Sequence, residues 1–281
     1  MLEAAILRSL ALAVVVTGLA AGAALAAGHP DLSGDWTNAS VTKLTRSGGK
    51  LVVSPTEAAQ IAAAATRYLD ADSQPTQALD RPPAAGNVGG YNAFWLDGGR
   101  TLSVVKGQYR TSWIVDPADG KLPLSEAGRK LIAAHQARHA SDRPPSDPEA
   151  MEPWDRCLIG SRGSGGPGML NNIYNSNYQI VQTPRSVVIV VEMIHDARTI
   201  PLFSDKATAE AHHGPAALQS WFGDSVGWWE GDTLVLETID VNPQEGAAGP
   251  IFLSPKARVT ERLTRVSPRQ IFYEFKVEDP A

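Results

Sequence analysis

A run of β-branched residues near the middle of the chain, Val187 to Ile194 (VVIVVEMI), constrains the fold most strongly. Its length and its β-branching, together with the Thr183-Pro184 break before it, predict a strand rather than a buried helix. Tyr178 to Gln182 predicts a second strand, joined to the first by a short hairpin. A third short strand is expected to begin at Arg198.

The end of this run carries several side chains capable of acid–base chemistry. Alternation along the strand puts Glu192 and His195 on opposite faces, and because both faces are apolar we expect at least one of the two to be partly buried. A histidine beside a carboxylate can transfer protons, and an arginine can stabilise an anion. The catalytic hypothesis therefore names His195, Glu192, Asp196 and Arg198. A salt-bridge cluster that fixes a turn explains the same residues, and a metal site is weaker because no third ligand is adjacent.

The segment before the hairpin, NNIYNSNY at residues 171–178, groups amide and phenol side chains. Such groups suit hydrogen bonding to a neutral polar ligand, and they also suit turns. Tryptophans elsewhere in the chain would supply apolar walls for a ligand, or would simply belong to the core. The ligand-binding hypothesis names Tyr174, Asn175, Asn177, Tyr178, Trp221 and Trp229.

The first 26 residues have the features of a secretory signal peptide. An apolar stretch runs from Ser9 to about Ala24, and Ala24-Leu25-Ala26 matches a small-x-small cleavage site. We therefore expect a periplasmic or secreted protein with no stable membrane insertion after cleavage. An uncleaved anchor is the alternative, although the apolar run is somewhat short for a membrane span.

The net charge bears on the class of partner, and the cysteine content bears on whether a disulfide can form. Removal of residues 1–26 removes one acid and one base, so the net charge stays at −5. This charge argues against a nucleic-acid partner, which would require a basic surface. Cys157 is the single cysteine, so no internal disulfide can form, and we expect this side chain to be a small buried hydrophobe. The sequence has no dinucleotide fingerprint and no closed set of metal ligands, so no cofactor or metal is expected.

Strand patterns separated by turns continue to the end of the chain. Residues 224–239 and 258–277 each predict a hairpin, and helices are expected from Ser54 and from Ser125. We predict a mainly β fold, an antiparallel barrel or strongly curved sheet with two or three peripheral helices. One β-rich domain would span residues 27–281, with subdomains over 27–140 and 154–281 as the alternative. The chain stops directly after a strand, which leaves open a C-terminally incomplete gene product.

Several blocks of sequence are distinctive, above all EMIHDAR at residues 192–198 and WWEGDTLVLET at residues 228–238. With DLSGDWT near the start, they resemble an uncharacterised family of exported bacterial proteins over nearly all of the predicted mature chain. The resemblance implies export and carries no catalytic role. The Gly34-Asp35-Trp36 opening is similar in style to lipocalin-like (calycin) barrels, an analogy of fold alone.

Three functions fit these observations. The first is binding of a small, partly apolar molecule in a pocket lined by Trp, Tyr and Asn. The second is a lyase, isomerase or hydrolase that uses His195 as its acid or base. The third is a structural envelope protein without a ligand. The sequence leaves open whether there is catalysis, the identity of the ligand and the oligomeric state.

Overall fold

The structure is a computed structural model, and it describes residues 28–72, 95–96, 98–139, 147–160, 165–218 and 220–281. The predicted signal peptide lies outside the described residues. Within the part that is described, no helix combines the length and the apolar composition needed to cross a membrane.

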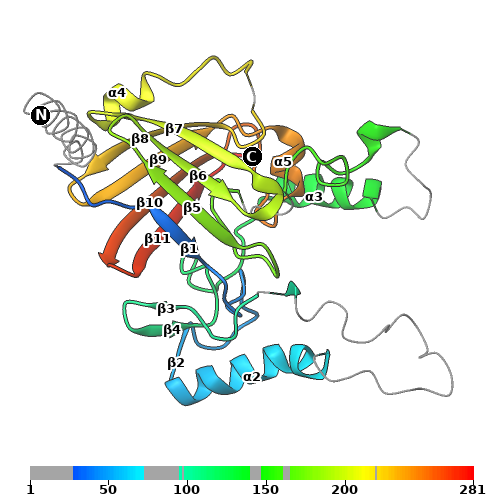
Figure 1. Cartoon of the computed structure of the whole chain (residues 1–281). Helices are drawn as coiled ribbons and strands as arrows, with labels where there is room; N and C mark the ends of the chain where they lie inside the picture. Colours follow the sequence, from blue (N-terminus) through cyan, green and yellow to red (C-terminus); the bar gives the residue numbers. More distant parts are fainter. Residues whose placement is uncertain (1–27, 73–94, 97, 140–146, 161–164, 219) are drawn as a thin grey trace, which may run out of the picture.

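The main feature of the fold is one eight-stranded sheet that curls strongly into a half-barrel (Figure 1). All neighbouring strands run antiparallel except β7 and β8, which are parallel. This confirms the predicted mainly β, strongly curved sheet. The half-barrel is open, with β1 and β11 at its edges. In order across the sheet the strands are β1 (Gly34–Thr37), β5 (Asn177–Gln182), β6 (Ser186–Val191), β7 (Ala197–Phe203), β8 (Asp224–Glu230), β9 (Thr233–Ile239), β10 (Arg258–Ser267) and β11 (Gln270–Glu278).

The three predicted hairpins are confirmed as β5–β6, β8–β9 and β10–β11. The predicted length of the central strand is wrong, because β6 ends at Val191. The chain then turns through a short 3-10 helix, η3 (Met193–His195), in which Ile194 and His195 have φ of 55° and 59°. These left-handed residues break the strand alternation, so Glu192 and His195 are both exposed and neither is partly buried as expected.

A second, smaller sheet has the order β2-β4-β3 and lies below the β1 side of the half-barrel in Figure 1. Its strands are β2 (Val52–Val53), β4 (Gln108–Arg110) and β3 (Val104–Val105). Helix α2 (Pro55–Asp72) follows β2 and begins where the sequence predicts. A capping box fixes this start, because Glu57 N donates to Ser54 Oγ at 3.2 Å and Ser54 N donates to Glu57 Oε2 at 2.8 Å.

Three further helices lie around the half-barrel. Helix α4 (Lys206–Glu210) packs on β7 and β8, while α3 (Glu126–His139) and α5 (Pro243–Ala248) lie side by side at one end (Figure 1). A 3-10 helix, η2 (Pro148–Ala150), precedes an irregular turn that contains Cys157. Cys157 is exposed and has a φ of 55°, so the prediction of a buried thiol is wrong.

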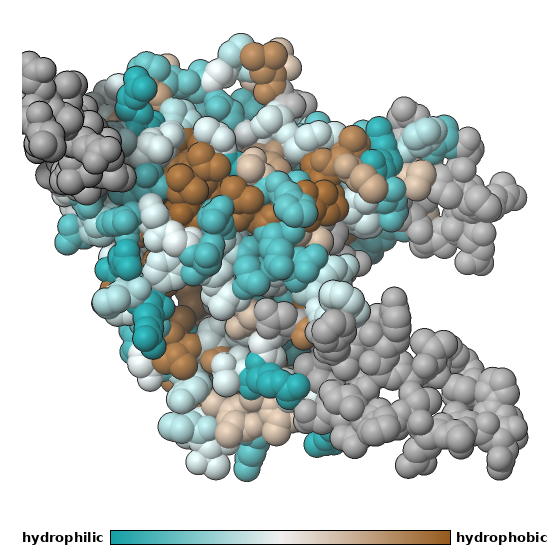
Figure 2. Space-filling model, in the orientation of Figure 1, coloured by the Kyte–Doolittle hydropathy of each residue, from teal (hydrophilic) through white to brown (hydrophobic). Residues whose placement is uncertain are grey.

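The main hydrophobic core lies on the inward face of the half-barrel. In β6 this face carries Val187, Ile189 and Val191, all fully buried, while the outward valines stay partly exposed. Figure 2 shows one outer face of the molecule, on which apolar groups remain visible among polar ones. The core consists of Leu32, Met169, Tyr178, Ile180, Val187, Ile189, Val191, Met193, Ile200, Leu234, Leu236 and Leu263.

Candidate functional site

A buried ion pair crosses the inward face of the half-barrel. Arg198 of β7 donates to Glu261 of β10, with Nη2–Oε2 at 2.5 Å and Nη1–Oε1 at 3.2 Å. The exposed fractions of the two side chains are 2% and 0%. Burial alone would raise the pKa of Glu261, but the Arg198 charge and its hydrogen bonds hold that pKa below its ordinary value. Both side chains are therefore charged in the core.

Neighbouring hydroxyl groups complete this network. Tyr273 Oη donates to Glu261 Oε1 at 2.7 Å, and Arg198 Nη2 donates to Thr238 Oγ1 at 3.2 Å and Ser225 Oγ at 3.4 Å. Arg198 Nε is buried and has no hydrogen-bond partner. The network draws its groups from five strands, β7 to β11, which suits a structural role in the core.

The glycine-rich segment 165–170 lies across the same network. Gly168 N donates to Glu261 Oε1 at 3.3 Å, and Met169 N donates to Tyr273 Oη at 2.8 Å. Gly166 has a φ of 81°, and a Cβ there would lie 2.3 Å from Arg198 Nη1. The segment therefore fills part of the half-barrel interior, where a barrel-type protein would hold its ligand.

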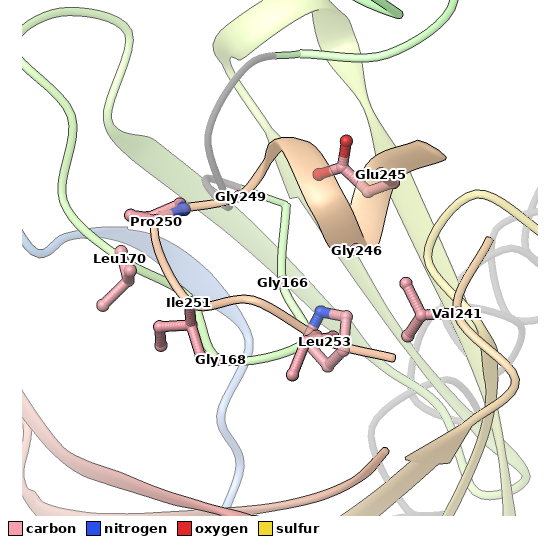
Figure 3. A pocket seen from close by; sticks show the side chains of 11 residues that line it. Gly166, Gly168, Leu170, Val241, Glu245, Gly246, Gly249, Pro250, Ile251 and Leu253 are labelled. Carbon is pink, nitrogen blue, oxygen red and sulfur yellow. The ribbon is translucent and has the colours of Figure 1, made fainter. Parts of the chain in front are cut away.

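A small pocket lies between segment 165–170 and segment 241–253 (Figure 3). Its volume of about 20 Å³ accommodates one water molecule but no organic molecule in this conformation. Glu245 of α5 is the single ionisable residue in a lining that is otherwise aliphatic or glycine. The lining residues are Gly166, Pro167, Gly168, Leu170, Val241, Glu245, Gly246, Gly249, Pro250, Ile251 and Leu253.

Glu245 is the most unusual ionisable group at this pocket. It is 5% exposed, and its Oε2 atom is buried without a hydrogen-bond partner. Burial, followed by repulsion from Asp196 and Glu152, raises the pKa of Glu245 to about 8. Asp196 accepts a hydrogen bond from Gly160 N at 2.5 Å, and burial raises its pKa as well. Ionisable groups with perturbed pKa values beside a pocket are typical of functional sites.

The structure separates the four residues of the catalytic hypothesis. His195 is exposed, and Glu192 is exposed and accepts from Asn177 Nδ2 at 2.8 Å. Arg198 points into the core, where Glu261 is its partner. Of the four, Asp196 alone acts electrostatically on Glu245, which lines the pocket.

The residues of the ligand-binding hypothesis are also dispersed. Tyr174 and Asn175 are exposed, and Asn177 is exposed beside Glu192. Tyr178 is buried, accepts from Asn38 Nδ2 at 3.2 Å and donates to Leu170 O at 3.3 Å. None of the six lines the pocket. Trp221 is half-buried, and Trp229 packs against the main core and stacks on His29 with ring centroids 4.5 Å apart.

A second polar cluster lies on the outward face of the sheet. His213 Nδ1 is 2.9 Å from Asp224 Oδ2, and His213 Nε2 is 3.3 Å from Glu237 Oε1. Arg258 also pairs with the buried Glu237. With every polar group of the ring engaged, this cluster fixes the 213–214 segment to β8 and β9 and offers no free group for chemistry.

Sequence reasoning missed Glu245 and Glu261. Glu261 alternates with Val259 and Leu263 along β10, so it shares their buried face, and that pattern was readable. Asn242-Pro243 followed by Glu245 is a helix-start pattern, and Asn242 Oδ1 does accept from Gln244 N at 2.9 Å. That pattern predicts the helix but gives no signal that Glu245 is buried.

Glu245 should make the protein less stable as pH rises. The folded state holds the Glu245 proton up to about pH 8, whereas the unfolded chain loses it near the ordinary pKa of 4.5. The stabilising effect of this proton is fully present below about pH 4.5, and it is lost as pH rises to about 8. We expect Glu245→Gln to gain up to about 5 kcal/mol over the wild type at high pH and little at low pH. Denaturant unfolding at both ends of this range measures the difference.

The exposed Glu126 on α3 offers a control with the same change of charge. Glu126→Gln should shift stability by less than about 0.5 kcal/mol at either pH. An effect of Glu245→Gln that is the same at low and high pH would contradict the prediction.

Across the described ranges, no group of three or more His, Cys, Asp or Glu side chains is arranged to hold a metal ion. Comparisons of the chain with protein-family models, with curated proteins and with solved structures find no match.

Proposed function

We propose that this is an exported protein that binds a small, partly apolar molecule at the pocket between segments 165–170 and 241–253. The observation that supports the proposal is Glu245, a buried carboxyl group with an unpartnered oxygen in an otherwise aliphatic lining. A buried polar group without a partner is costly, and a ligand that supplies the missing hydrogen bond removes that cost. A mainly apolar lining with one polar group is the usual composition of a small-molecule site.

Binding requires the pocket to enlarge. Segment 249–253 contains no helix or strand, and Ile251 on it is only half-buried. The opposite wall is fixed, because Gly168 and Met169 hydrogen-bond to Glu261 and Tyr273. We therefore expect the 249–253 side to move outward in the bound state and the 165–170 side to stay in place.

A second candidate function is acid–base catalysis in the same pocket. Glu245 keeps its proton to about pH 8, whereas the pKa of Asp196 is raised by burial from an ordinary value of 3.8 and is lowered in part by the hydrogen bond from Gly160 N. Two carboxyl groups whose pKa values differ can serve as acid and base in one reaction. In this reading Glu245 takes the role that the sequence suggested for His195, and the reaction class stays lyase, isomerase or hydrolase.

Native mass spectrometry tests the binding proposal. The full chain would be exported to a bacterial periplasm, purified gently and examined for a retained organic adduct. Ile251→Trp fills the mouth of the pocket, so we expect it to reduce the adduct at least tenfold. Leu218→Trp, at a position that is 71% exposed, is the control and should retain the adduct.

An adduct that persists in Ile251→Trp would place the ligand elsewhere and contradict the proposal. If the wild type carries no adduct and none of the small molecules extracted from the same periplasm binds it, the structural role gains support instead. Turnover of a bound molecule by the wild type but not by Glu245→Gln would favour the catalytic candidate.

A further inference from the structure

Four separate parts of the chain bring ionisable side chains together around Glu245. His135 comes from α3, Glu152 from the turn after η2, Asp196 from the end of η3 and Glu245 from α5. His135 Nε2 lies 2.9 Å from Glu152 Oε1, and Asp196 is held by Gly160 N. Helix α3 packs on α5, and Asp196 and Glu152 act electrostatically on Glu245, so these groups form one cluster around this residue of the pocket lining.

Among the described residues, the charges that raise the pKa of Glu245 have one sign. The ionisable groups that act on it are Asp196 and Glu152, both acids, and both disfavour its ionised form. In the part of the chain that the structure covers, no lysine or arginine makes an ion pair with Glu245 or Asp196. Glu152 has His135 as a partner, whereas Glu245 has none. Asp196 and Glu152 therefore contribute a negative potential at Glu245.

This arrangement differs from the other buried acids of the protein. Glu261 has Arg198, and Glu237 has Arg258 and His213. Each of these pairs compensates the loss of hydration of the carboxylate. Glu245, 5% exposed, has no such ion-pair partner among the described residues, its Oε2 is buried without a hydrogen-bond partner, and the residue lines the pocket that the proposed function uses.

We infer that the ligand of this pocket is an amine, whose protonated nitrogen pairs with the Glu245 carboxylate while its hydrocarbon part contacts Leu170, Ile251 and Leu253. The inference rests on the proposed binding function and adds the chemical class of the ligand. A cation is the one group that would satisfy Glu245 and also reduce its repulsion with Asp196 and Glu152. The aliphatic walls then favour a small branched or cyclic hydrocarbon part over a polar one.

The pH dependence of binding separates an amine from a neutral ligand. At neutral pH Glu245 holds a proton, because its pKa is about 8. An ammonium group must displace that proton, so its affinity should rise about tenfold per pH unit from pH 6 until the pKa is approached. A neutral acceptor such as an alcohol would use the protonated carboxyl as a donor, so its affinity should fall as pH passes 8.

Methyl-resolved NMR of the full chain provides the test. Isobutylamine, isobutanol and isobutyric acid have the same hydrocarbon part and differ in charge. Each would be titrated at several pH values up to its solubility limit, with the methyl signals of Leu170, Val241, Ile251 and Leu253 as the readout. We expect the amine to bind at least tenfold more tightly than the alcohol at pH 8, and the acid to bind most weakly.

Two variants sharpen the test. Glu245→Gln should weaken the amine at least tenfold and abolish its pH dependence, whereas Glu126→Gln should change neither. Asp196→Asn removes a charge that raises the Glu245 pKa, so the amine's affinity should level off at a lower pH. A merely structural role of Asp196 would change affinity without moving that pH.

The outcomes distinguish the inference from the proposed function. Equal affinity for amine and alcohol, or affinity for the alcohol that falls as pH rises, would overturn the amine and leave the binding pocket in place. If none of the three probes shifts the wall methyls, the amine inference fails, and the binding proposal fails with it only if the wild type also retains no adduct from the periplasm.

Discussion

Glu261→Gln should lower the free energy of unfolding by about 3–5 kcal/mol, the usual loss when one member of a buried ion pair is removed. The variant leaves Arg198 charged and fully buried, with Thr238, Ser225 and one neutral amide oxygen in place of a carboxylate. Tyr273 Oη and Gly168 N would keep an oxygen to donate to, but without its charge. Denaturant unfolding at neutral pH, followed by far-ultraviolet circular dichroism, measures the loss.

An exposed acid in the neighbouring hairpin supplies the control. Glu230 pairs with Arg262 at 2.8 Å, and both side chains are substantially exposed. Glu230→Gln should therefore cost less than about 1 kcal/mol. The double variant Arg198→Met with Glu261→Leu should be more stable than either single variant, since it leaves no unpaired charge in the core. A loss of under 1 kcal/mol in Glu261→Gln would contradict the assignment of a charged, buried pair.

Leu236→Ala is expected to destabilise the protein by about 3–4 kcal/mol. Leu236 lies in β9, between β8 and β10, and is fully buried on the inward face. Close neighbours restrict any collapse of the cavity: a Cβ built on Gly227 would lie 3.0 Å from Leu236 Cδ2. Thermal and denaturant unfolding give the change in stability.

Val181→Ala is the matched control for that variant. Val181 is also a strand residue, in β5, but it is 43% exposed, so its truncation should cost less than about 1 kcal/mol. Similar losses in the two variants would mean that the inward face is not the main core.

The parts of the fold that could be predicted are those with local signals. The turns after Gln182, Glu230 and Ser267 are marked by proline, glycine and polar residues, and each of these hairpins is present. Helix α2 begins at a capping box whose residues lie three apart in the sequence. Alternation along the strands then predicted a curved sheet with one buried face.

The candidate site depends on contacts between distant residues, which no local pattern reveals. The sequence groups Arg198 with Glu192, His195 and Asp196 because they are neighbours in the chain, yet its partner, Glu261, is 63 residues away. The strand ends at Val191, and the chain then turns through left-handed backbone at Ile194 and His195. A β-branched residue such as Ile194 rarely adopts that conformation, so the sequence did not indicate this turn. Glu245 lies in a six-residue helix whose burial depends on α3 and on Leu253.

The glycine-rich segment 165–170 also sets the order in which the chain can fold. Its anchor on Tyr273 is 104 residues later in the sequence, and its anchor on Glu261 is 93 residues later. Strand β1 likewise cannot pair with β5 until a long loop has closed, since Asp35 pairs with Gln179. Long loops must therefore close before the interior is filled, and refolding should be slow, with the 165–170 segment becoming protected from hydrogen exchange only after β10 and β11 have paired.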